Sequence, residues 1–173
     1  MIFVGADAGL SGALCAFDLD RGPIDVIDMP LAQDGRKTMQ LDVRQMCRWL
    51  HGHNPSRVVL ERTAPLPGFE TATGERSRPM GAVSAFRSGV LYGQLRATCE
   101  ANGIPLSLVT AVIWKRWFNL IGPDKEQGRQ LALKLYPQCG ELLRRKMDHN
   151  RADAILIASW GASHWRGLEA GTV

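Results

Sequence analysis

The first eighteen residues constrain the fold most, because they place a carboxylate at the end of a strand that is apolar throughout. Residues 2–6 (IFVGA) form a short apolar run, which is typical of a strand buried on both faces in the middle of a sheet. Asp7 follows this run, and Gly9 and Gly12 predict a turn into a second apolar strand over residues 13–17. A buried, ionised carboxylate needs a metal, a basic partner or hydrogen-bond donors. Asp7 is therefore a candidate site residue, and the alternative is an Asp that only caps the turn.

Length and composition favour a single domain over residues 1–173. The chain has 173 residues, of which 45% are hydrophobic, so it can bury a full core without staples and is not disordered. It contains no apolar run long enough for a bilayer and no basic leader of a signal peptide, so we expect a soluble, cytoplasmic protein without a membrane partner. The four cysteines show no paired spacing, which argues against a zinc site or a disulfide framework. A net charge of +4 permits a polyanionic partner.

The next segments predict an α/β fold in which two acids become neighbours. Residues 24–27 complete an antiparallel meander, a helix over residues 41–50 follows, and residues 58–60 form a fourth, apolar strand. Glu61 ends this strand just as Asp7 ends the first. A helical crossover allows the fourth strand to lie parallel to the first, so both carboxylates should meet at one edge of the sheet.

The middle of the chain completes a five-stranded mixed sheet, flanked by helices, with the expected order 3-2-1-4-5. Residues 104–109 supply the last strand, and residues 32–38 are interpreted as a polar, turn-rich connection. The long helix predicted over residues 82–102 contains Gly89 and Gly93. Each mid-helix glycine costs about 1 kcal/mol relative to alanine, so we expect a close approach to the sheet or to a second subunit.

Two regions favour nucleic acid as the polyanionic partner. Residues 63–81 show no periodicity and begin directly after Glu61, so we expect a mobile, functional loop; a tolerated surface insertion is the alternative. Residues 114–118 (WKRWF) mix aromatic and basic side chains, which suits phosphate contact and base stacking, although tryptophans at this spacing also anchor cores. The candidate DNA-binding residues are Arg62, Arg76, Arg78, Lys115 and Lys125.

The last predicted helix adds a third acidic position. His149 and Asp153 are four residues apart and share one helix face, while Asp148 suits the cap position. Capping does not explain Asp153, an acid beside a metal-capable imidazole in an otherwise apolar helix. With Asp7 and Glu61 these residues form an oxygen-rich set typical of sites for Mg²⁺ or Mn²⁺. The set predicts a two-metal phosphodiesterase site, in which one ion activates water and the other stabilises the leaving 3′ oxygen.

The order of these parts resembles the ribonuclease H-like fold and, more closely, the RuvC-like Holliday-junction resolvases, particularly the small versions found in phages and prophages. The resemblance rests on four segments: GADAGLSGA around Asp7, VVLER at Glu61, VTAVIWKRWFNLIGPDKE at residues 109–126 and DHNRADAILIA at residues 148–158. It implies a homodimeric, magnesium-dependent endonuclease, with Mn²⁺ as a substitute, that acts in a bacterial cell. The implied partner is branched DNA, either a four-way junction or a Y or flap structure.

The resemblance also assigns roles to single residues. Asp7, Glu61 and Asp153 match metal ligands of the family, and His149 joins them as a catalytic candidate. RuvC proteins place a fourth ligand three residues before the last Asp, where this chain has Asn150. Asn binds a metal only through a neutral oxygen, so His149 or Asp148 would have to serve instead, and His149 fits the helical face better. This departure affects the metal site and not the fold.

Three alternatives belong to other classes of function. A non-catalytic branched-DNA-binding protein would keep the basic loops without needing all three acids. Another ribonuclease H-like nuclease would act on RNA/DNA hybrids. The glycine-rich turn after Asp7 also resembles the phosphate-binding turn of actin-like and sugar-kinase ATPases, but those enzymes need two such lobes, and 173 residues offer one.

Overall fold

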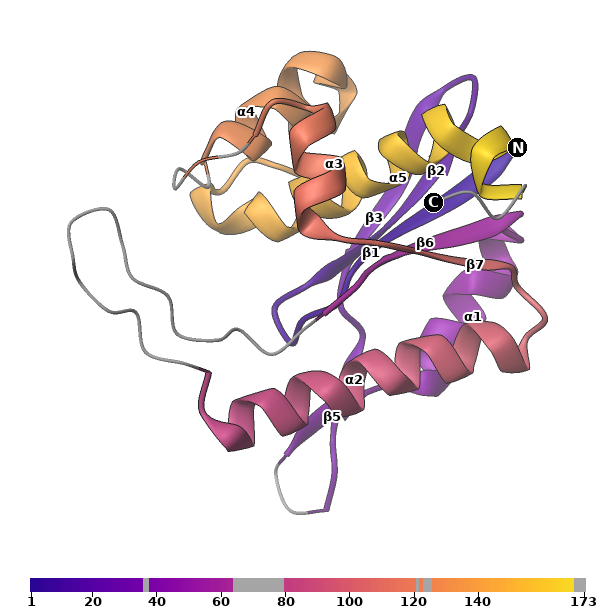
Figure 1. The fold of residues 1–173 in the computed structure, drawn as a ribbon, viewed down its shortest axis with the longest axis vertical. Coiled ribbons are helices and arrows are strands. Elements are labelled where there is room, and N and C mark those ends of the chain that lie inside the picture. The colour runs from indigo at the N-terminus through magenta and orange to yellow at the C-terminus, as the bar shows by residue number, and fades with distance from the viewer. Residues whose placement is uncertain (36–37, 64–79, 121, 123–125, 170–173) are drawn as a thin grey trace.

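One five-stranded mixed sheet forms the centre of the molecule (Figure 1). The computed structural model describes residues 1–35, 38–63, 80–120, 122 and 126–169, with the backbone alone for 166–169. The strands are β1 (Ile2–Asp7), β2 (Ala13–Asp18), β3 (Gly22–Asp28), β6 (Arg57–Glu61) and β7 (Leu106–Val109). Strand β1 pairs with β2 in antiparallel and with β6 in parallel orientation, so the predicted meander and crossover are confirmed.

The strand order is β3-β2-β1-β6-β7, and not 3-2-1-4-5 in the numbering of the chain. The predicted fourth and fifth strands are β6 and β7, because two short strands precede them. These are β4 (Leu31–Gln33) and β5 (Met39–Leu41), which form a separate two-stranded sheet within the segment interpreted as a turn-rich connection. Strands of three residues are too short to show a period of two, which is why the sequence pattern did not reveal them.

Helices cover both faces of the sheet. They are α1 (Val43–His53), α2 (Ala82–Ala101), α3 (Ala111–Trp117), α4 (Glu126–Leu135) and α5 (His149–Glu169), with short 3₁₀ turns η1 (Pro137–Cys139) and η2 (Lys146–Asp148). Figure 1 shows α1 and α2 on one face, and α3, α4 and α5 on the other. In the described part of the chain, none of these helices combines the length and apolarity needed to cross a membrane. All four cysteines are free thiols.

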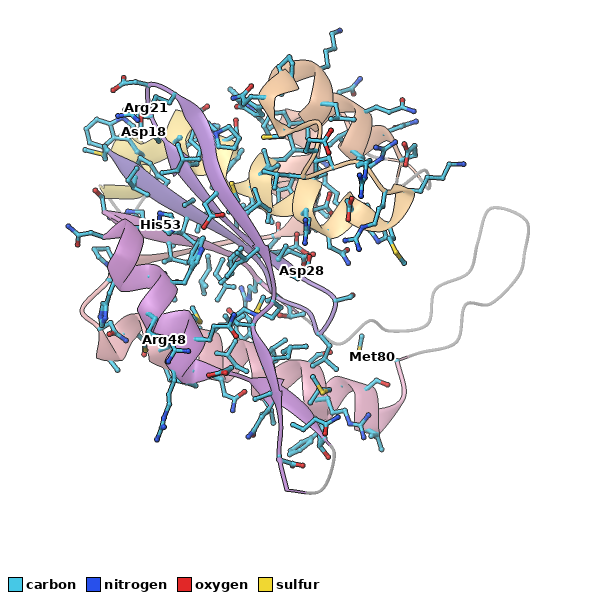
Figure 2. The ribbon with its side chains drawn as sticks, turned by 180° about the vertical axis from the view of Figure 1, so that it is seen from behind. Asp18, Arg21, Asp28, Arg48, His53 and Met80 are labelled. Atoms are coloured by element: carbon cyan, nitrogen blue, oxygen red, sulfur yellow. The ribbon has the colours of Figure 1, made fainter. Side chains whose placement is uncertain are left out.

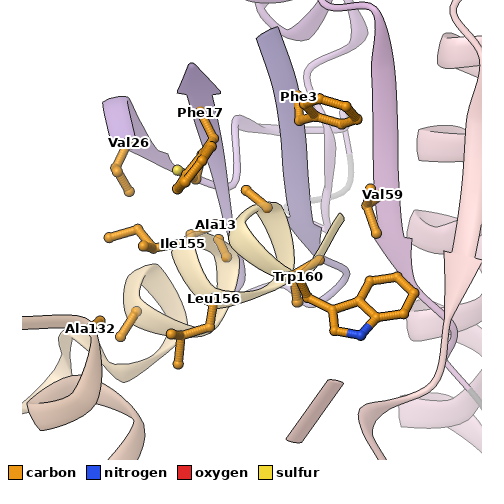
Figure 3. Packing of buried hydrophobic residues seen from close by; sticks show 14 of the residues in the cluster. Phe3, Ala13, Phe17, Val26, Val59, Ala132, Ile155, Leu156 and Trp160 are labelled. Carbon is orange, nitrogen blue, oxygen red and sulfur yellow. The ribbon is translucent and has the colours of Figure 1, made fainter. Parts of the chain in front are cut away.

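Alternation along the strands sets the face to which each acid points. Phe3 on β1 and Val59 on β6 pack in the cluster that includes α5 (Figure 3), whereas the residues beside them face α1 and α2. Side chains at every second position of a strand share a face. Asp7 and Glu61 have the same parity as Phe3 and Val59, so both carboxylates lie on the α5 face.

Helix α5 lies directly on the backbone of β1. A Cβ atom at Gly5 would be 2.2 Å from the carbonyl oxygen of Ala154 and 2.4 Å from the nitrogen of Ala158, so only glycine allows this approach. The small residues of α5 and Gly5 therefore form one contact, which fixes the height of the helix above the sheet. Because Asp153 directly precedes Ala154, the same contact brings a third acid toward the end of β1.

Candidate active site

Asp7 and Glu61 lie side by side at the ends of two parallel strands. Ala6 pairs with Leu60 across β1 and β6, so the next residue of each strand is an acid. The turn after Asp7 is tight: the N–H of Gly9 donates to the carbonyl of Asp7 at 3.1 Å, and a Cβ at Gly12 would lie 2.0 Å from the same oxygen. Glycine at position 12 therefore allows the chain to reverse immediately after the carboxylate.

Asp153 completes the group from the first turns of α5. A cavity of about 210 Å³ opens between the sheet edge, α3, α4 and α5. Its lining residues are Asp7, Lys115, Leu120, Gly122, Gly128, His149, Asn150 and Asp153. Gly128 leaves room for the carboxylate, since a Cβ there would lie 3.2 Å from Oδ1 of Asp153. Asp7 and Asp153 thus line one cavity, and Glu61 lies close enough to Asp7 to raise its pKa.

Burial acts on the carboxylates of both Asp7 and Glu61, and like charge acts on Asp7 as well. Burial raises the pKa of Asp7 to about 7, with further increases from Glu61 and Asp153 and an opposing effect from Lys115. The pKa of Glu61 is also raised by burial, while a hydrogen bond from Trp114 and the charge of Lys115 lower it. The site therefore holds acids whose ionised forms are disfavoured until a cation arrives.

Among the described residues, Lys115 is the lysine or arginine that lines this cavity. Its Nζ lies 3.9 Å from Oδ2 of Asp153 and 5.1 Å from the centre of the Trp114 ring. The sequence predicted phosphate contact for Lys115, and the structure places it among the carboxylates.

Sequence reasoning missed the role of Trp114, which the pattern presented only as a core anchor or a stacking ring. Trp114 is fully buried, and its Nε1–H donates to Oε2 of Glu61 at 2.7 Å. Spacing alone gave no sign of this bond, because it joins a helix to a strand 53 residues away.

The three candidates for a fourth ligand are separated by the structure. His149 and Asn150 both line the cavity, and the side-chain N–H of Asn150 donates to the carbonyl of Ser11 in the turn after Asp7. Asp148 is 3% exposed and is absent from that lining. Its carboxylate accepts hydrogen bonds from the backbone and guanidinium of Arg145, each at 2.7 Å. Asp148 thus caps the turn η2, while His149 and Asn150 reach the site.

Comparison with known proteins places this site within a familiar fold. No family model matches the sequence. The chain is 34% identical over 93 residues to the chloroplastic Holliday junction resolvase MOC1 of Chlamydomonas reinhardtii, and the match covers 52% of the chain but 10% of that relative. Thermus thermophilus RuvC, solved in complex with a Holliday junction substrate, matches with a TM-score of 0.60 at 15% identity over 99% of this chain and 97% of that one. A second Thermus thermophilus RuvC structure gives a TM-score of 0.51 at 17% identity, over 99% and 98% of the two chains. The chain has the RuvC fold.

Within the RuvC fold, ion pairs hold the start of α5 against the sheet. The guanidinium of Arg151 binds both carboxylate oxygens of Asp28, at 2.6 and 2.8 Å, and donates to the carbonyl of Leu142 at 3.3 Å. Figure 2 shows Asp28 at the end of β3, beside this helix. The hydrogen bond from Arg151 lowers the pKa of Asp28, so the pair stays ionised. The position of His149, Asn150 and Asp153 is therefore set by contacts on both sides of the helix.

The predicted DNA-binding residues fall into two groups. Arg62 is exposed directly after Glu61, and Lys115 lies in the cavity. Arg76, Arg78 and Lys125 lie outside the described residues. Of the two tryptophans near Lys115, Trp114 is buried, whereas Trp117 is 58% exposed. The Trp117 ring packs edge-on against His164, with 4.5 Å between the ring centres.

The donor set of the RuvC-fold site fits a hard divalent cation. Carboxylate oxygens are the ligands that Mg²⁺ and Mn²⁺ prefer, and burial, the largest cause of the raised pKa of Asp7 and Glu61, disfavours their ionised forms, which a cation would stabilise. Among the described residues, no group of three His, Cys, Asp or Glu side chains is already arranged to hold an ion. Binding would therefore draw the three carboxylates closer together.

Proposed function

We propose that this protein is a divalent-metal-dependent, structure-selective endonuclease that cleaves phosphodiester bonds at Holliday junctions or related branched DNA. The observation that carries the proposal is the grouping of three acids on the α5 face: Asp7 and Asp153 line one cavity, and Glu61 lies beside Asp7 at the end of the neighbouring strand. Such a group of buried like charges opposes folding. A protein that only bound DNA would be more stable without it, so the carboxylates favour a catalytic role over the non-catalytic alternative.

The substrate class is supported by the fold and by the relatives. The curated relative is named a Holliday junction resolvase, and a RuvC of the same fold was solved with a junction substrate. The matched stretch amounts to a tenth of that curated relative, so the activity of the whole relative comes to this chain only as a proposal.

Mg²⁺, with Mn²⁺ as a substitute, is the proposed cofactor, held by Asp7, Glu61 and Asp153. Two bound metal ions would activate water and stabilise the leaving 3′ oxygen, as in other two-metal phosphodiesterases. His149 and Asn150 are the side chains placed to complete the ligand set, since both line the cavity. Burial of Asp7 strengthens its attraction for a cation, because less water screens the charge.

The basic residues of the site are proposed to hold the scissile phosphate. Lys115 is 38% exposed and so can exchange its contact with Asp153 for a phosphate oxygen while metal ions neutralise the carboxylates. Arg62 is exposed one residue beyond Glu61 and can contact the DNA backbone next to the cleaved phosphodiester bond. Arg76, Arg78 and Lys125 are proposed to extend this surface.

A homodimer is part of the proposal, with α2 at its centre. Val83, Phe86 and Val90 are exposed along one side of α2, and with Gly89 and Gly93 they form what we call the α2 stripe. A Cβ at either glycine would meet nothing within 4 Å, so these glycines do not serve an approach to the described parts of the chain's own sheet. A second copy would bury the apolar side chains and use the space above the glycines.

A cleavage assay on Asp7→Asn tests the function. The substitution keeps the shape but removes a charge that holds the ions, so Mg²⁺-dependent cleavage of a four-way junction should fall by several orders of magnitude. Binding of the junction should persist or tighten, because a negative charge facing phosphates is lost. Asp20→Asn, in the exposed turn between β2 and β3, removes the same charge at the opposite end of the sheet and serves as control.

Two results would contradict the proposal. One is a wild-type protein that cleaves neither branched DNA nor RNA/DNA hybrids with Mg²⁺ or Mn²⁺. The other is an Asp7→Asn variant that nicks junctions as fast as the wild type, once contaminating nuclease is excluded. Cleavage of hybrids in preference to junctions would instead favour the alternative ribonuclease H-like activity.

A further inference from the structure

Trp114 makes a direct bond to one of the proposed metal ligands. The indole is fully buried, and its N–H donates to Oε2 of Glu61 at 2.7 Å. A buried indole N–H needs an acceptor, and here the acceptor is a carboxylate with a raised pKa, not a backbone carbonyl. A charge-assisted bond of this kind is stronger and more directional than a neutral one.

The backbone fixes where this indole stands. Glu61 pairs with Val109 across β6 and β7, and the N–H of Arg62 donates to the carbonyl of Val109 at 2.7 Å. Helix α3 begins at Ala111, so Trp114 lies one turn into a helix that starts beside Glu61. The register of β6 and β7 and the first turn of α3 thus bring Trp114 next to Glu61. The contact therefore depends on the backbone more than on side-chain flexibility.

We propose that Trp114 is a positioning residue that orients the carboxylate of Glu61 for a divalent cation. The hydrogen bond from Trp114 holds Oε2 of Glu61 in place and so restricts rotation of the carboxylate. This restriction limits the directions from which Oε1 can bind an ion. Mutation of residues that hydrogen-bond to a metal ligand typically weakens metal affinity about 10–100-fold. The Trp114 ring also lies 5.1 Å from Nζ of Lys115, so one side chain contacts both a proposed ligand and the cavity cation. This inference rests on the proposed function, because it concerns the same metal site.

The chain contains a matched control for this contact. The N–H of Trp49 donates to Oδ2 of Asp25, also at 2.7 Å, and Trp49 lies in α1, on the face of the sheet opposite to α3 and α5. The two indole–carboxylate bonds thus have the same length and chemistry but lie in different places. Any effect of the metal site should appear at Trp114 and not at Trp49.

The first test follows the indole N–H groups in the wild-type protein. In ¹⁵N-labelled, metal-free protein titrated with Mg²⁺, the Trp114 indole resonance should move in step with binding, whereas the Trp49 resonance should stay in place. Trp114→Phe and Trp49→Phe assign the two signals. This measurement uses the intact protein, so it remains decisive if Trp114→Phe fails to fold, since assignment can then proceed through the other tryptophans.

The second test measures Mn²⁺ affinity by calorimetry. Trp114→Phe should bind Mn²⁺ about 10–100-fold more weakly than the wild type, whereas Trp49→Phe should bind equally well. In a Glu61→Gln background, Trp114→Phe should cause no further loss, because the carboxylate that it positions is gone. A merely structural loss of the indole would lower affinity in both backgrounds.

The outcomes separate this inference from the proposed function. A wild-type protein that binds Mn²⁺ and cleaves junctions, while Trp114→Phe binds as tightly, would overturn the positioning role and leave the nuclease intact. A stationary Trp114 resonance during saturating Mg²⁺ binding would do the same. A wild-type protein that binds neither ion would overturn the proposed metal site itself, and the positioning role with it.

Discussion

Asp7 links the stability of the protein to pH. Its pKa of about 7, above the ordinary 3.8, means that the folded protein holds a proton on Asp7 between about pH 4 and pH 7 where the unfolded chain has lost it. Stability without metal should therefore fall as pH rises through this window, by at most about 4 kcal/mol, and level off above it. Asp7→Asn removes this dependence, so in EDTA the variant should gain stability over the wild type between pH 5 and pH 8.

Urea unfolding at pH 5 and at pH 8 gives the free energy of unfolding that tests this prediction. Mg²⁺ added at pH 8 should stabilise the wild type and not Asp7→Asn, because only a folded site with the carboxylate binds the ion. Asp20→Asn is the control and should follow the wild-type profile. If the free energy of unfolding changed with pH in the same way for the wild type and Asp7→Asn, ionisation of Asp7 would not destabilise the fold. Asp7 would then behave as a simple turn residue.

Lys115 should affect DNA binding more than fold. Lys115→Ala removes one cation that can meet a phosphate, so junction affinity should fall and its dependence on salt should decrease by roughly one counterion. Fluorescence anisotropy at several salt concentrations measures both quantities. Arg144→Ala removes an exposed cation that lies 3.9 Å from the exposed Glu141, and it should leave the slope unchanged. An unchanged slope for Lys115→Ala would mean that Lys115 serves the carboxylates alone.

Single residues show where sequence reasoning succeeds. Asp7 and Glu61 could be placed together because each directly follows an apolar strand, and parallel strands bring their ends to one edge. The contact of Trp114 with Glu61 could not be predicted, because it depends on the rotation of α3 about its axis after β7. The same rotation turns Lys115 toward Asp153, where the sequence suggested only an exposed, phosphate-facing cation.

At the scale of elements, the contact between β1 and α5 holds the site together. Gly5→Ala would place a methyl group against the backbone of α5 at Ala154 and Ala158, so the helix must move away. Overpacking of this kind destabilises by about 1–3 kcal/mol or more. Because Asp153 moves with the helix, cleavage should fall as well, by about 100-fold for a displacement near 1 Å.

Thermal unfolding and cleavage at a temperature where the variant is folded measure these two effects. Gly52→Ala in α1 is the control, since a Cβ there meets nothing within 4 Å. It should leave cleavage unchanged and stabilise the helix by up to about 1 kcal/mol. If Gly5→Ala were as stable and active as Gly52→Ala, the height of α5 above the sheet would not control the site.

Elements differ in how far the sequence determines them. The continuous apolar runs of β1 and β6 and the 20-residue helix α2 were predictable from the sequence. The strands β4 and β5 were not, because they have three residues each and depend on pairing with one another. The backbone N–H of Leu41 on β5 also bonds to the side chain of Gln94 on α2, at 3.2 Å, a contact that no local pattern shows.

At the scale of the whole molecule, the sequence predicted the architecture, and the family resemblance implied a homodimer. The mid-helix glycines of α2 suggested a close approach either to the sheet or to a second subunit. The structure turns the α2 stripe away from the sheet, since Leu91 and Leu95 face the core and the glycines are exposed. Of the two alternatives, the exposed glycines therefore favour the proposed second copy over an approach to the sheet.

Substitutions in the α2 stripe test the proposed dimer. Phe86 is 73% exposed in the single chain, so Phe86→Glu should fold normally but place a charge at the centre of the interface. Gly93→Arg should fill the space that a second helix would occupy. Both variants should sediment as monomers and lose paired incision of the two strands of a symmetric junction, while each keeps its metal site. Val112→Glu, on exposed α3 on the opposite face of the sheet, should remain dimeric. A wild-type protein that stays monomeric at every concentration, alone and with junction DNA, would overturn the proposed dimer.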